Sequence, residues 1–424
     1  MKVLVVGSGA REHALVTSLL ADAGVTEVVA APGNAGIASV VRTITLDVAD
    51  ALQVAALAQT EAVDLVVIGP EVPLVVGAAD AVRAMGIACF GPSQAAAQIE
   101  GSKAFAKQVM AEAGVPTAMA AACSSLDEAA EALDRFGAPY VVKDDGLAAG
   151  KGVVVTSDRD EALAHVRSCL ARGVDARVLI EEFLDGPEVS LFAVTDGKTV
   201  VALQPAQDFK RVGDGDTGPN TGGMGAYSPL PWAPGGLVDD VTVRVLQPVV
   251  DAMRERGTPF SGLLYAGLAM TSSGVRVIEF NARFGDPETQ VVLANLRTPI
   301  GGLLLASATG TLAAAAPLEW APGFAVTVVV AAAGYPADPR TGDVVGGLEE
   351  AAELAGVNIF HAGTTVNGDG GVASSGGRVL SVTARGATLA AARERAYAAI
   401  DLIKLEGSHY RSDIAMAASL EVEG

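Results

Sequence analysis

Residues 277–290 read V-I-E-F-N-A-R-F-G-D-P-E-T-Q, a strand-like run followed by a charged turn. Side chains alternate sides along a strand, so Glu279 and Asn281 are predicted to share one face while Ile278 and Phe280 point into a core. Carboxylate and amide oxygens suit Mg²⁺, which usually also holds substrate phosphates. Arg283, in the turn, could bind a carboxylate or phosphate through two parallel hydrogen bonds. The stretch therefore predicts an active site.

A simpler alternative exists for the same residues. Glu279 could be a solvated residue at a sheet edge, with Arg283 as its ion-pair partner. A motif of this length also occurs by chance, so the stretch alone leaves both interpretations open. The rest of the chain has to distinguish them.

Composition bounds the class of protein. The chain has 424 residues, enough for two or three domains, and half of them are apolar. A formal net charge of −20 argues against binding to a nucleic-acid backbone, which needs clustered Lys and Arg. The three cysteines, Cys89, Cys123 and Cys169, form no CxxC pair and are odd in number, which favours a reduced, cytoplasmic protein.

The sequence predicts no membrane segment. The apolar run at the start is too short for a signal peptide. Residues 298–318 carry no charge, but glycines and hydroxyl residues interrupt them, and Pro299 and Pro317 bracket them. This pattern indicates a buried helix and its exit turn rather than a membrane span.

Strands and helices alternate through the first hundred residues. Apolar strands are predicted at 3–6, 28–31, 65–68 and 88–90, with helices between them, which indicates a parallel sheet covered on both faces. The loops after the first three strands contain Gly9, Asn34 and Glu71. Ligands bind at the carboxyl ends of such strands, and glycines let backbone N–H groups approach a phosphate.

A dinucleotide-binding fold is the competing interpretation of this region. Its fingerprint requires glycine or alanine at position 12, where this chain has Glu12, and an acidic residue at the end of the second strand. Because neither is present, nicotinamide or flavin binding is disfavoured.

A glycine-rich loop follows a helix that is predicted from Ser102 to Ala113. It contains Lys151 and lies between strands at 140–143 and 153–156, the first of which ends in Lys143. The Walker class is excluded, because Gly152 and a strand follow the lysine where that motif has Ser or Thr and a helix. A plain hairpin is the alternative, but two lysines favour a flap over a nucleotide.

Two further segments bear on function. A strand at 177–182 ends in Glu181 and leads to Phe183 and Leu184, with Glu188 close behind. Residues 207–231 are predicted to form one long loop, which is functional because Asp208 and Lys210 precede its glycine cluster. The residues from about 321 alternate short strands with a helix at 389–400 and indicate a separate α+β lobe.

Taken in order, the segments match a known pattern: G-S-G-A-R-E-H-A, A-P-G-N-A-G, G-P-E-V-P-L, G-S-K-A-F, D-G-L-A-A-G-K-G, I-E-E-F-L-D-G-P-E, G-D-T-G-P-N-T-G-G-M-G-A-Y-S-P and I-E-F-N-A-R-F-G-D-P-E-T-Q. Together they resemble the phosphoribosylamine–glycine ligases, which belong to the ATP-grasp enzymes. The resemblance implies an α/β fold with an amino-terminal Rossmann-like parallel-sheet domain at 1–101 and an ATP-grasp domain at 102–320. It also implies a mobile lid at about 116–190 and a small α+β domain at 321–424.

The resemblance also implies a reaction. ATP, glycine and 5-phosphoribosylamine would give glycinamide ribonucleotide, ADP and phosphate through a glycyl phosphate intermediate, in de novo purine biosynthesis. The implied cofactors are ATP and Mg²⁺ or Mn²⁺, and the partners are the small-molecule substrates, with no nucleic acid and no membrane. A monomer in the cytoplasm is compatible with this activity.

Roles carried over by the resemblance cover metal, nucleotide and substrate binding. The metal ligands are Glu279 and Asn281, and the nucleotide-binding residues are Lys103, Lys143, Lys151, Glu181, Phe183, Leu184 and Glu188. The catalytic residues are Arg283, Asp286 and Asp208, and the substrate-binding residues are Gly9, Asn34, Glu71, Lys210 and Gly285. The chain departs from the family pattern at Asp144, where a small residue is usual, and at Phe209, where histidine is common.

Two other functions would use the same ATP-grasp elements. A different carboxylate–amine ligase is disfavoured by the specific segment at 283–290. A non-catalytic nucleotide-binding regulator is disfavoured because the predicted metal ligands and phosphate-binding lysines are all present.

Overall fold

The computed structural model describes residues 1–146, 152–173 and 176–421. Its amino-terminal lobe is the predicted parallel sheet, in the order β3-β2-β1-β4-β5. Strands β1 and β4 are buried along most of their length, because helices cover both faces. The strands are β1 (Lys2–Gly7), β2 (Glu27–Pro32), β3 (Arg42–Thr43), β4 (Leu65–Ile68) and β5 (Ala88–Phe90). The helices are α1 (Ala10–Leu20), α2 (Ala35–Val40), α3 (Ala51–Thr60), α4 (Glu71–Val75) and α5 (Ala78–Ala84).

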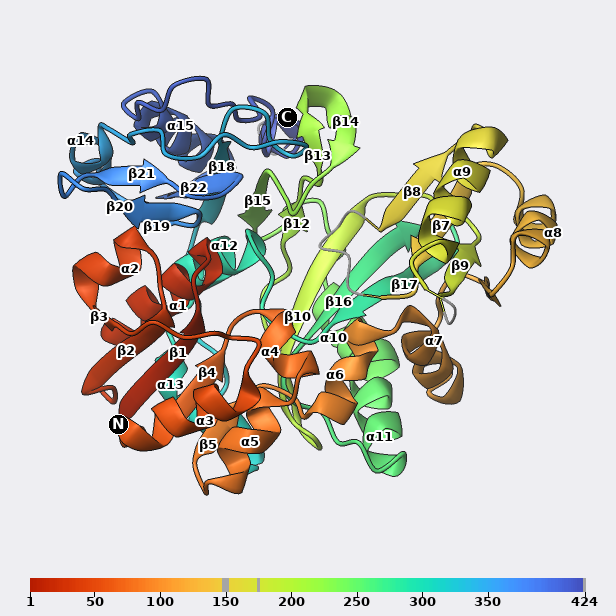
Figure 1. Ribbon diagram of the computed structural model, residues 1–424, viewed down its shortest axis with the longest axis horizontal. Helices are drawn as coiled ribbons and strands as arrows, with labels where there is room; N and C mark the ends of the chain where they lie inside the picture. The colour runs from red at the N-terminus through yellow and green to blue at the C-terminus, as the bar shows by residue number, and fades with distance from the viewer. Residues whose placement is uncertain (147–151, 174–175, 422–424) are drawn as a thin grey trace.

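A four-stranded antiparallel sheet forms the centre of the molecule, in the order β11-β10-β16-β17 (Figure 1). Its strands are β10 (Glu188–Asp196), β11 (Val200–Ala202), β16 (Ser261–Thr271) and β17 (Gly274–Asn281). The central helices are α6 (Gln94–Gly101), α7 (Lys103–Glu112), α10 (Leu237–Val241), η2 (Thr242–Leu246), α11 (Gln247–Glu255), α12 (Glu288–Asn295) and α13 (Ile300–Thr309). The uncharged run at 298–318 contains α13 and the short η3 (Leu312–Ala314). In the described part of the chain, no helix combines the length and hydropathy that a membrane span requires.

A small lobe lies at the far right of Figure 1 and has a hydrophobic core of its own. Its antiparallel sheet has the order β6-β9-β7-β8, with two helices packed on it. The elements are β6 (Ala120–Cys123), α8 (Leu126–Phe136), β7 (Tyr140–Asp144), β8 (Val153–Thr156), α9 (Arg159–Leu170) and β9 (Val178–Glu181). The separate core is compatible with a lid, whose motion stays a prediction.

The carboxy-terminal lobe is built on a sheet in the order β12-β15-β18-β22-β19, to which the central region contributes β12 (Gln207–Asp208) and β15 (Gly225–Ser228). Its main elements are β18 (Phe324–Ala331), α14 (Leu348–Ala352), β19 (Val357–His361), β22 (Arg378–Gly386), α15 (Leu389–Ile400) and α16 (Met416–Glu421). A hairpin of β20 (Thr364–Val366) and β21 (Val372–Ser374) completes the lobe. Figure 1 shows this lobe beside the amino-terminal one, with α12 between them.

The prediction of one long loop at 207–231 was wrong. The segment contains β12 (Gln207–Asp208), β13 (Arg211–Gly213), η1 (Asp214–Asp216), β14 (Thr217–Asn220) and β15 (Gly225–Ser228). Strand β15 pairs antiparallel with β18, so its partner lies about a hundred residues later in the chain. Such short strands, rich in glycine and proline, are not recognisable from the local sequence, because pairing with a distant strand stabilises them.

Two buried histidines join the amino- and carboxy-terminal lobes. His13 Nδ1, on α1, accepts a hydrogen bond of 2.9 Å from the amide of His361 at the end of β19, and the ring of His13 packs edge-on against Phe360. Burial, with His361 as a second cause, lowers the pKa of His13 to about 3. Burial lowers the pKa of His361 to about 4. Both rings are therefore neutral in the folded chain at ordinary pH.

This interface predicts acid sensitivity. Between pH 6.5 and 4 the unfolded chain binds protons on both histidines while the folded chain does not, so the free energy of unfolding falls as the pH falls. His13→Asn keeps an acceptor for the amide of His361 but cannot be protonated. We expect its melting temperature to fall less between pH 7 and pH 5 than that of the unmodified chain, measured by calorimetry.

Phe360→Leu serves as the control for this experiment. It weakens the same contact without removing a titratable group, so it should lower the melting temperature similarly at both pH values. An unchanged pH dependence in His13→Asn would contradict a role for His13 in acid sensitivity.

Candidate active site

Strand β17 presents the two predicted metal ligands at the outer edge of the central sheet. Glu279 and Asn281 lie opposite Gly267 and Tyr265 of β16 and are partly exposed, while Phe280 between them is buried. The expectation that Ile278 points into the core was wrong. The register shifts at this position, so Val277, and not Ile278, is fully buried in the core.

These two oxygen donors fit a metal that arrives with a nucleotide. In the described residues, no group of three or more His, Cys, Asp or Glu side chains is arranged to hold an ion by itself. Mg²⁺ is commonly bound by one or two protein oxygens, with phosphates and waters as the other ligands. The chemistry of the donor set therefore favours a metal shared with ATP.

Two lysines face this strand, the buried Lys143 from the small lobe and the partly exposed Lys107 from α7. Lys143 Nζ lies 2.8 Å from Glu181 Oε2 and donates to the carbonyl of Ile278 at 3.1 Å, and Lys107 Nζ lies 3.0 Å from Glu181 Oε1. Burial alone would lower the pKa of Lys143, but the carboxylates of Glu181 and Glu279 outweigh it and raise that pKa. Lys143 is thus a desolvated cation beside the metal-ligand face.

The next residue, Asp144, faces away from this site, as strand alternation predicts. Its carboxylate forms an ion pair with Arg172, at the end of α9. The acid that departs from the family pattern is thereby paired on the side of the strand away from Lys143.

Lys103 lies at the start of α7, which Ser102 caps through a hydrogen bond to the amide of Phe105. Its Nζ donates to the carbonyl of Gly146 at 3.0 Å, at the base of the predicted flap. Asp145 anchors the same junction by accepting from the amide of Ala104 at 3.0 Å. Lys151, the predicted flap residue, lies outside the described residues.

In the segment predicted to bind adenine, residues 181–184, the side chain of the first residue is used within the protein, whereas the backbone of the last two is not. The side chain of Glu181 is buried and is used by both lysines, whereas Phe183 is half exposed. The backbone groups of Phe183 and Leu184 make no hydrogen bond with another described residue. They are therefore free to receive the edge of a base.

A second cluster consists of Glu188 at the start of β10, Asp208 of β12 and Lys210, which lies between β12 and β13. Lys210 Nζ is paired with the carboxylate of Glu188 and lies 3.4 Å from Asp208 Oδ1. Burial raises the pKa of Asp208 to about 7; Lys210 opposes this shift, and Glu288 and Glu188 add to it. Asp208 can therefore exchange a proton near neutral pH.

Arg283 joins the end of β17 to the amino-terminal lobe. Its Nη2 lies 3.0 Å from Glu100 Oε1, and its Nε lies 3.4 Å from Glu71 Oε2. The alternative in which Arg283 pairs with Glu279 is therefore wrong. The Nε group is buried and faces the Glu71 carboxylate at a distance longer than a good hydrogen bond.

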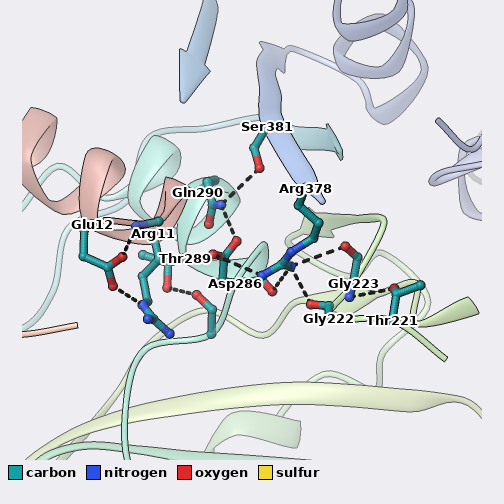
Figure 2. A network of polar contacts seen from close by, with 12 residues as sticks. Arg11, Glu12, Thr221, Gly222, Gly223, Asp286, Thr289, Gln290, Arg378 and Ser381 are labelled. Atoms are coloured by element: carbon teal, nitrogen blue, oxygen red, sulfur yellow. Dashed lines mark hydrogen bonds and ion pairs between the residues drawn. The ribbon is translucent and has the colours of Figure 1, made fainter. Parts of the chain in front are cut away.

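Asp286 lies where the lobes meet. Figure 2 shows its carboxylate between Gln290 of α12, which donates to Oδ1 at 2.9 Å, and Arg378, whose Nη2 lies 3.3 Å from Oδ2. Although burial alone would raise it, Arg378 and Arg11 hold the pKa of Asp286 below its usual value. Gly285, beside it, is buried, and a Cβ there would meet Glu288 Oε2 at 2.5 Å, so a larger residue would displace the Glu288 carboxylate.

The strand-end loops of the amino-terminal lobe reach the same place. A Cβ on Gly9 would lie 3.3 Å from Asp286 Oδ2, so these two segments are adjacent in space. The amide of Gly9 donates to Glu12 Oε2 at 2.6 Å, which places a carboxylate where a dinucleotide fold needs a small residue. The side chain of Asn34 caps α2 and donates to the carbonyls of Ser8 and His361, so it ties the loops together.

Several residues that the structure places at the site were not identified from the sequence. Lys107 follows Lys103 by four residues, so helical periodicity could have placed it on the same face. Glu100 and Arg11 belong to segments that were already of interest, but nothing in the sequence indicated their contacts with the 282–284 segment. Arg378 gave no signal at all.

Comparisons with known proteins agree along the chain. Three models of phosphoribosylglycinamide synthetase match it, namely the N domain at residues 1–100, the ATP-grasp (A) domain at 101–289 and the C domain at 325–417. A phosphoribosylamine–glycine ligase of Streptomyces coelicolor is 64% identical over 421 residues, which cover 99% of this chain and 100% of that protein. One from Mycobacterium tuberculosis is 57% identical over 424 residues, with 99% of each chain covered.

Solved structures give the same picture. A crystal structure of phosphoribosylamine–glycine ligase from Thermotoga maritima superposes with a TM-score of 0.84 at 33% identity and covers 98% of this chain and 100% of that one. A biotin carboxylase domain from Hydrogenobacter thermophilus, at 16% identity, has a TM-score of 0.72 and covers 96% of this chain and 91% of that one. The second likeness concerns the fold alone.

The ion pairs of Arg283 predict a large effect on stability. Arg283→Met removes the cation that pairs directly with Glu71 and Glu100, so the free energy of unfolding should fall by about 3 kcal/mol. Urea titration measures this change. The matched control is Arg254→Met, which removes a half-exposed arginine paired with Asp251 and should cost less than about 1 kcal/mol. Equal losses in the two variants would show that the Arg283 pairs do not hold the lobes together.

Proposed function

The chain belongs to the phosphoribosylglycinamide synthetase family, and from this premise we propose how its residues carry out the reaction. The protein is a phosphoribosylamine–glycine ligase, which joins glycine to 5-phosphoribosylamine with consumption of ATP in purine biosynthesis. A carboxylate is a poor electrophile, so glycine must first be activated. We propose that ATP phosphorylates it to glycyl phosphate, whose carbonyl carbon the amine then attacks as phosphate leaves.

One observation supports this function above the others. The loops at the strand ends of the amino-terminal lobe lie against the segment that follows the metal-ligand strand, through Gly9 at Asp286 and Glu71 at Arg283. Two substrates can therefore be held side by side, with the nucleotide on the central sheet. Holding reactants in this way supplies much of the rate enhancement when little covalent chemistry falls to the protein.

We assign nucleotide binding to the face between β17 and the lid. Glu279 and Asn281 would hold Mg²⁺ or Mn²⁺, which when bound neutralises charge on the transferring phosphoryl group. Lys143 and Lys103, with Lys151 beyond the described residues, would contact phosphates. The free backbone groups of Phe183 and Leu184, next to Glu181, would receive the adenine, and Glu188 the ribose.

Substrate binding is assigned to the residues around the lobe junction. Arg283 and Asp286 would orient glycine. Gly9, Asn34 and Glu71 would shape the phosphoribosyl site together with Lys210 and Gly285. Asp208 would accept the proton that the attacking amine loses, because its raised pKa matches neutral conditions.

Further proposals concern organisation and location. We keep the domain boundaries at 1–101, 102–320 and 321–424, with a lid at about 116–190 that closes on ATP. We propose a cytoplasmic location and action as a monomer on small molecules only. The buried, unpaired thiols of Cys89, Cys123 and Cys169 support a reducing compartment.

The assignment of function predicts a strict substrate requirement. ADP release should need glycine and phosphoribosylamine together, and Glu279→Gln should lower the rate by at least about a hundredfold because it removes an ionised metal ligand. A coupled ADP assay, omitting each substrate in turn, measures both. Glu131→Gln, on the exposed face of the lid helix α8, is the control and should retain full activity. ATP turnover that is indifferent to glycine would overturn the function.

Asp208 predicts a pH dependence. If its carboxylate must be ionised, kcat/KM for phosphoribosylamine rises with pH through about 7, since this parameter reports groups of the free enzyme. Asp208→Asn should remove that acid limb and lower kcat/KM by about a hundredfold. Asp239→Asn, at an exposed position of α10, should leave the profile unchanged. An acid limb that persists in Asp208→Asn belongs to another group and would contradict the proposed base.

A further inference from the structure

Arg378 belongs to the carboxy-terminal lobe but reaches out of it. It is the first residue of β22, and its guanidinium extends to the segment after the central sheet (Figure 2). Nη2 lies 3.3 Å from Asp286 Oδ2, and Nη1 donates to the backbone carbonyl of Asp286 at 2.7 Å. One side chain thus holds both the carboxylate and the main chain of a residue assigned to the substrate.

The same guanidinium also holds a glycine loop. Nη1 of Arg378 donates to the carbonyl of Gly222 at 2.5 Å and approaches that of Gly223 at 3.4 Å. Gly223 has a φ of +107°, and a Cβ there would meet Pro287 Cδ at 2.5 Å, so the loop packs directly on the peptide that follows Asp286. Only a residue without a side chain allows this approach.

The second carboxylate oxygen of Asp286 is fixed independently. Gln290, which is fully buried, donates from Nε2 to Oδ1 at 2.9 Å, and the same Nε2 lies 3.4 Å from Ser381 Oγ of β22. Both oxygens of the carboxylate are therefore held, Oδ2 by Arg378 of β22 and Oδ1 by Gln290, which itself contacts Ser381 of β22. Such a grip fixes the side-chain rotamer before a ligand arrives.

We propose that Arg378 is a positioning residue for the ligase reaction, through which the carboxy-terminal lobe sets the orientation of Asp286 and of the 221–223 loop. This inference rests on the proposed role of Asp286 toward glycine. Arg378 acts through Asp286, because its Nη1 donates to the carbonyls of Asp286 and Gly222 and its Nη2 faces the Asp286 carboxylate. The planar guanidinium group is required for this role. A lysine has a single charged nitrogen and cannot donate to a carboxylate and several carbonyls in this geometry.

Steady-state kinetics of Arg378→Lys test the proposal. Misplacing Asp286 should lower kcat/KM for glycine by about tenfold to a hundredfold, while KM for ATP stays within about twofold. Arg385→Lys is the matched control, because Arg385 also starts from β22 and donates to Asn295 Oδ1 and to a backbone carbonyl, but away from the site. It should retain the parameters of the unmodified enzyme. Unchanged kcat/KM for glycine in Arg378→Lys, or equal effects in both variants, would overturn the proposal.

A double-mutant cycle separates positioning from general stability. If Arg378 acts through Asp286, Arg378→Lys should cause little further loss in an Asp286→Asn background, measured by single-turnover ADP formation. Additive losses would overturn the proposal. Arg378→Gln, which keeps one donor, is taken through the same cycle if the lysine variant fails to fold. The glycine requirement of the unmodified enzyme is measured first, so failure of the proposed function is distinguished from failure of this inference.

Discussion

The junction of the lobes depends on one guanidinium placed between two carboxylates. Arg283 follows β17 directly, Glu71 begins α4 after β4, and Glu100 lies in α6. A poorly solvated charge is tolerated only beside opposite charges, so separating these elements would leave unpaired ions. The strand with Glu279 and Asn281 is therefore fixed relative to the strand-end loops. The spacing between the proposed metal-ligand face and the strand-end loops follows from that constraint.

On the side of the site that we assign to the nucleotide, cations are held by a carboxylate. The chain carries a net charge of −20, yet Lys143 is buried and Lys107 is partly buried where phosphates are expected. Glu181 supplies the counter-charge for both lysines. Because the ammonium groups are already desolvated and oriented by the protein, little reorganisation is needed when a polyanion binds. A local arrangement of a few buried charges thus overrides the overall charge of the molecule.

Periodicity and loop chemistry predicted the amino-terminal sheet and several later elements, whereas the ATP-grasp architecture was implied by the family resemblance, and the misses have physical causes. The parallel sheet was predictable because its strands are continuously apolar and end in glycine loops, and the helix at 389–400 because its alanine-rich pattern has a clear start at Thr388. The strands within 207–231 were not predictable, since β15 depends on its pairing with β18. The displacement of Ile278 results from a local register shift that alternation cannot reveal. Arg378 lies 92 residues from Asp286 in the sequence, within a glycine-rich stretch without charged neighbours.

The segment at 283–290 explains why the most informative sequence is the turn and not the strand before it. A metal-ligand strand needs only two oxygen donors, which many chains can supply. The turn makes polar contacts with three different parts of the molecule. Arg283 contacts the amino-terminal lobe, and Asp286 and Gln290 contact β22. Glu288 accepts a hydrogen bond from Tyr265 of the central sheet at 2.7 Å. A change at any of these positions leaves a buried polar group unpaired in a different lobe. Packing at the junction therefore restricts this segment more tightly than metal binding restricts the strand.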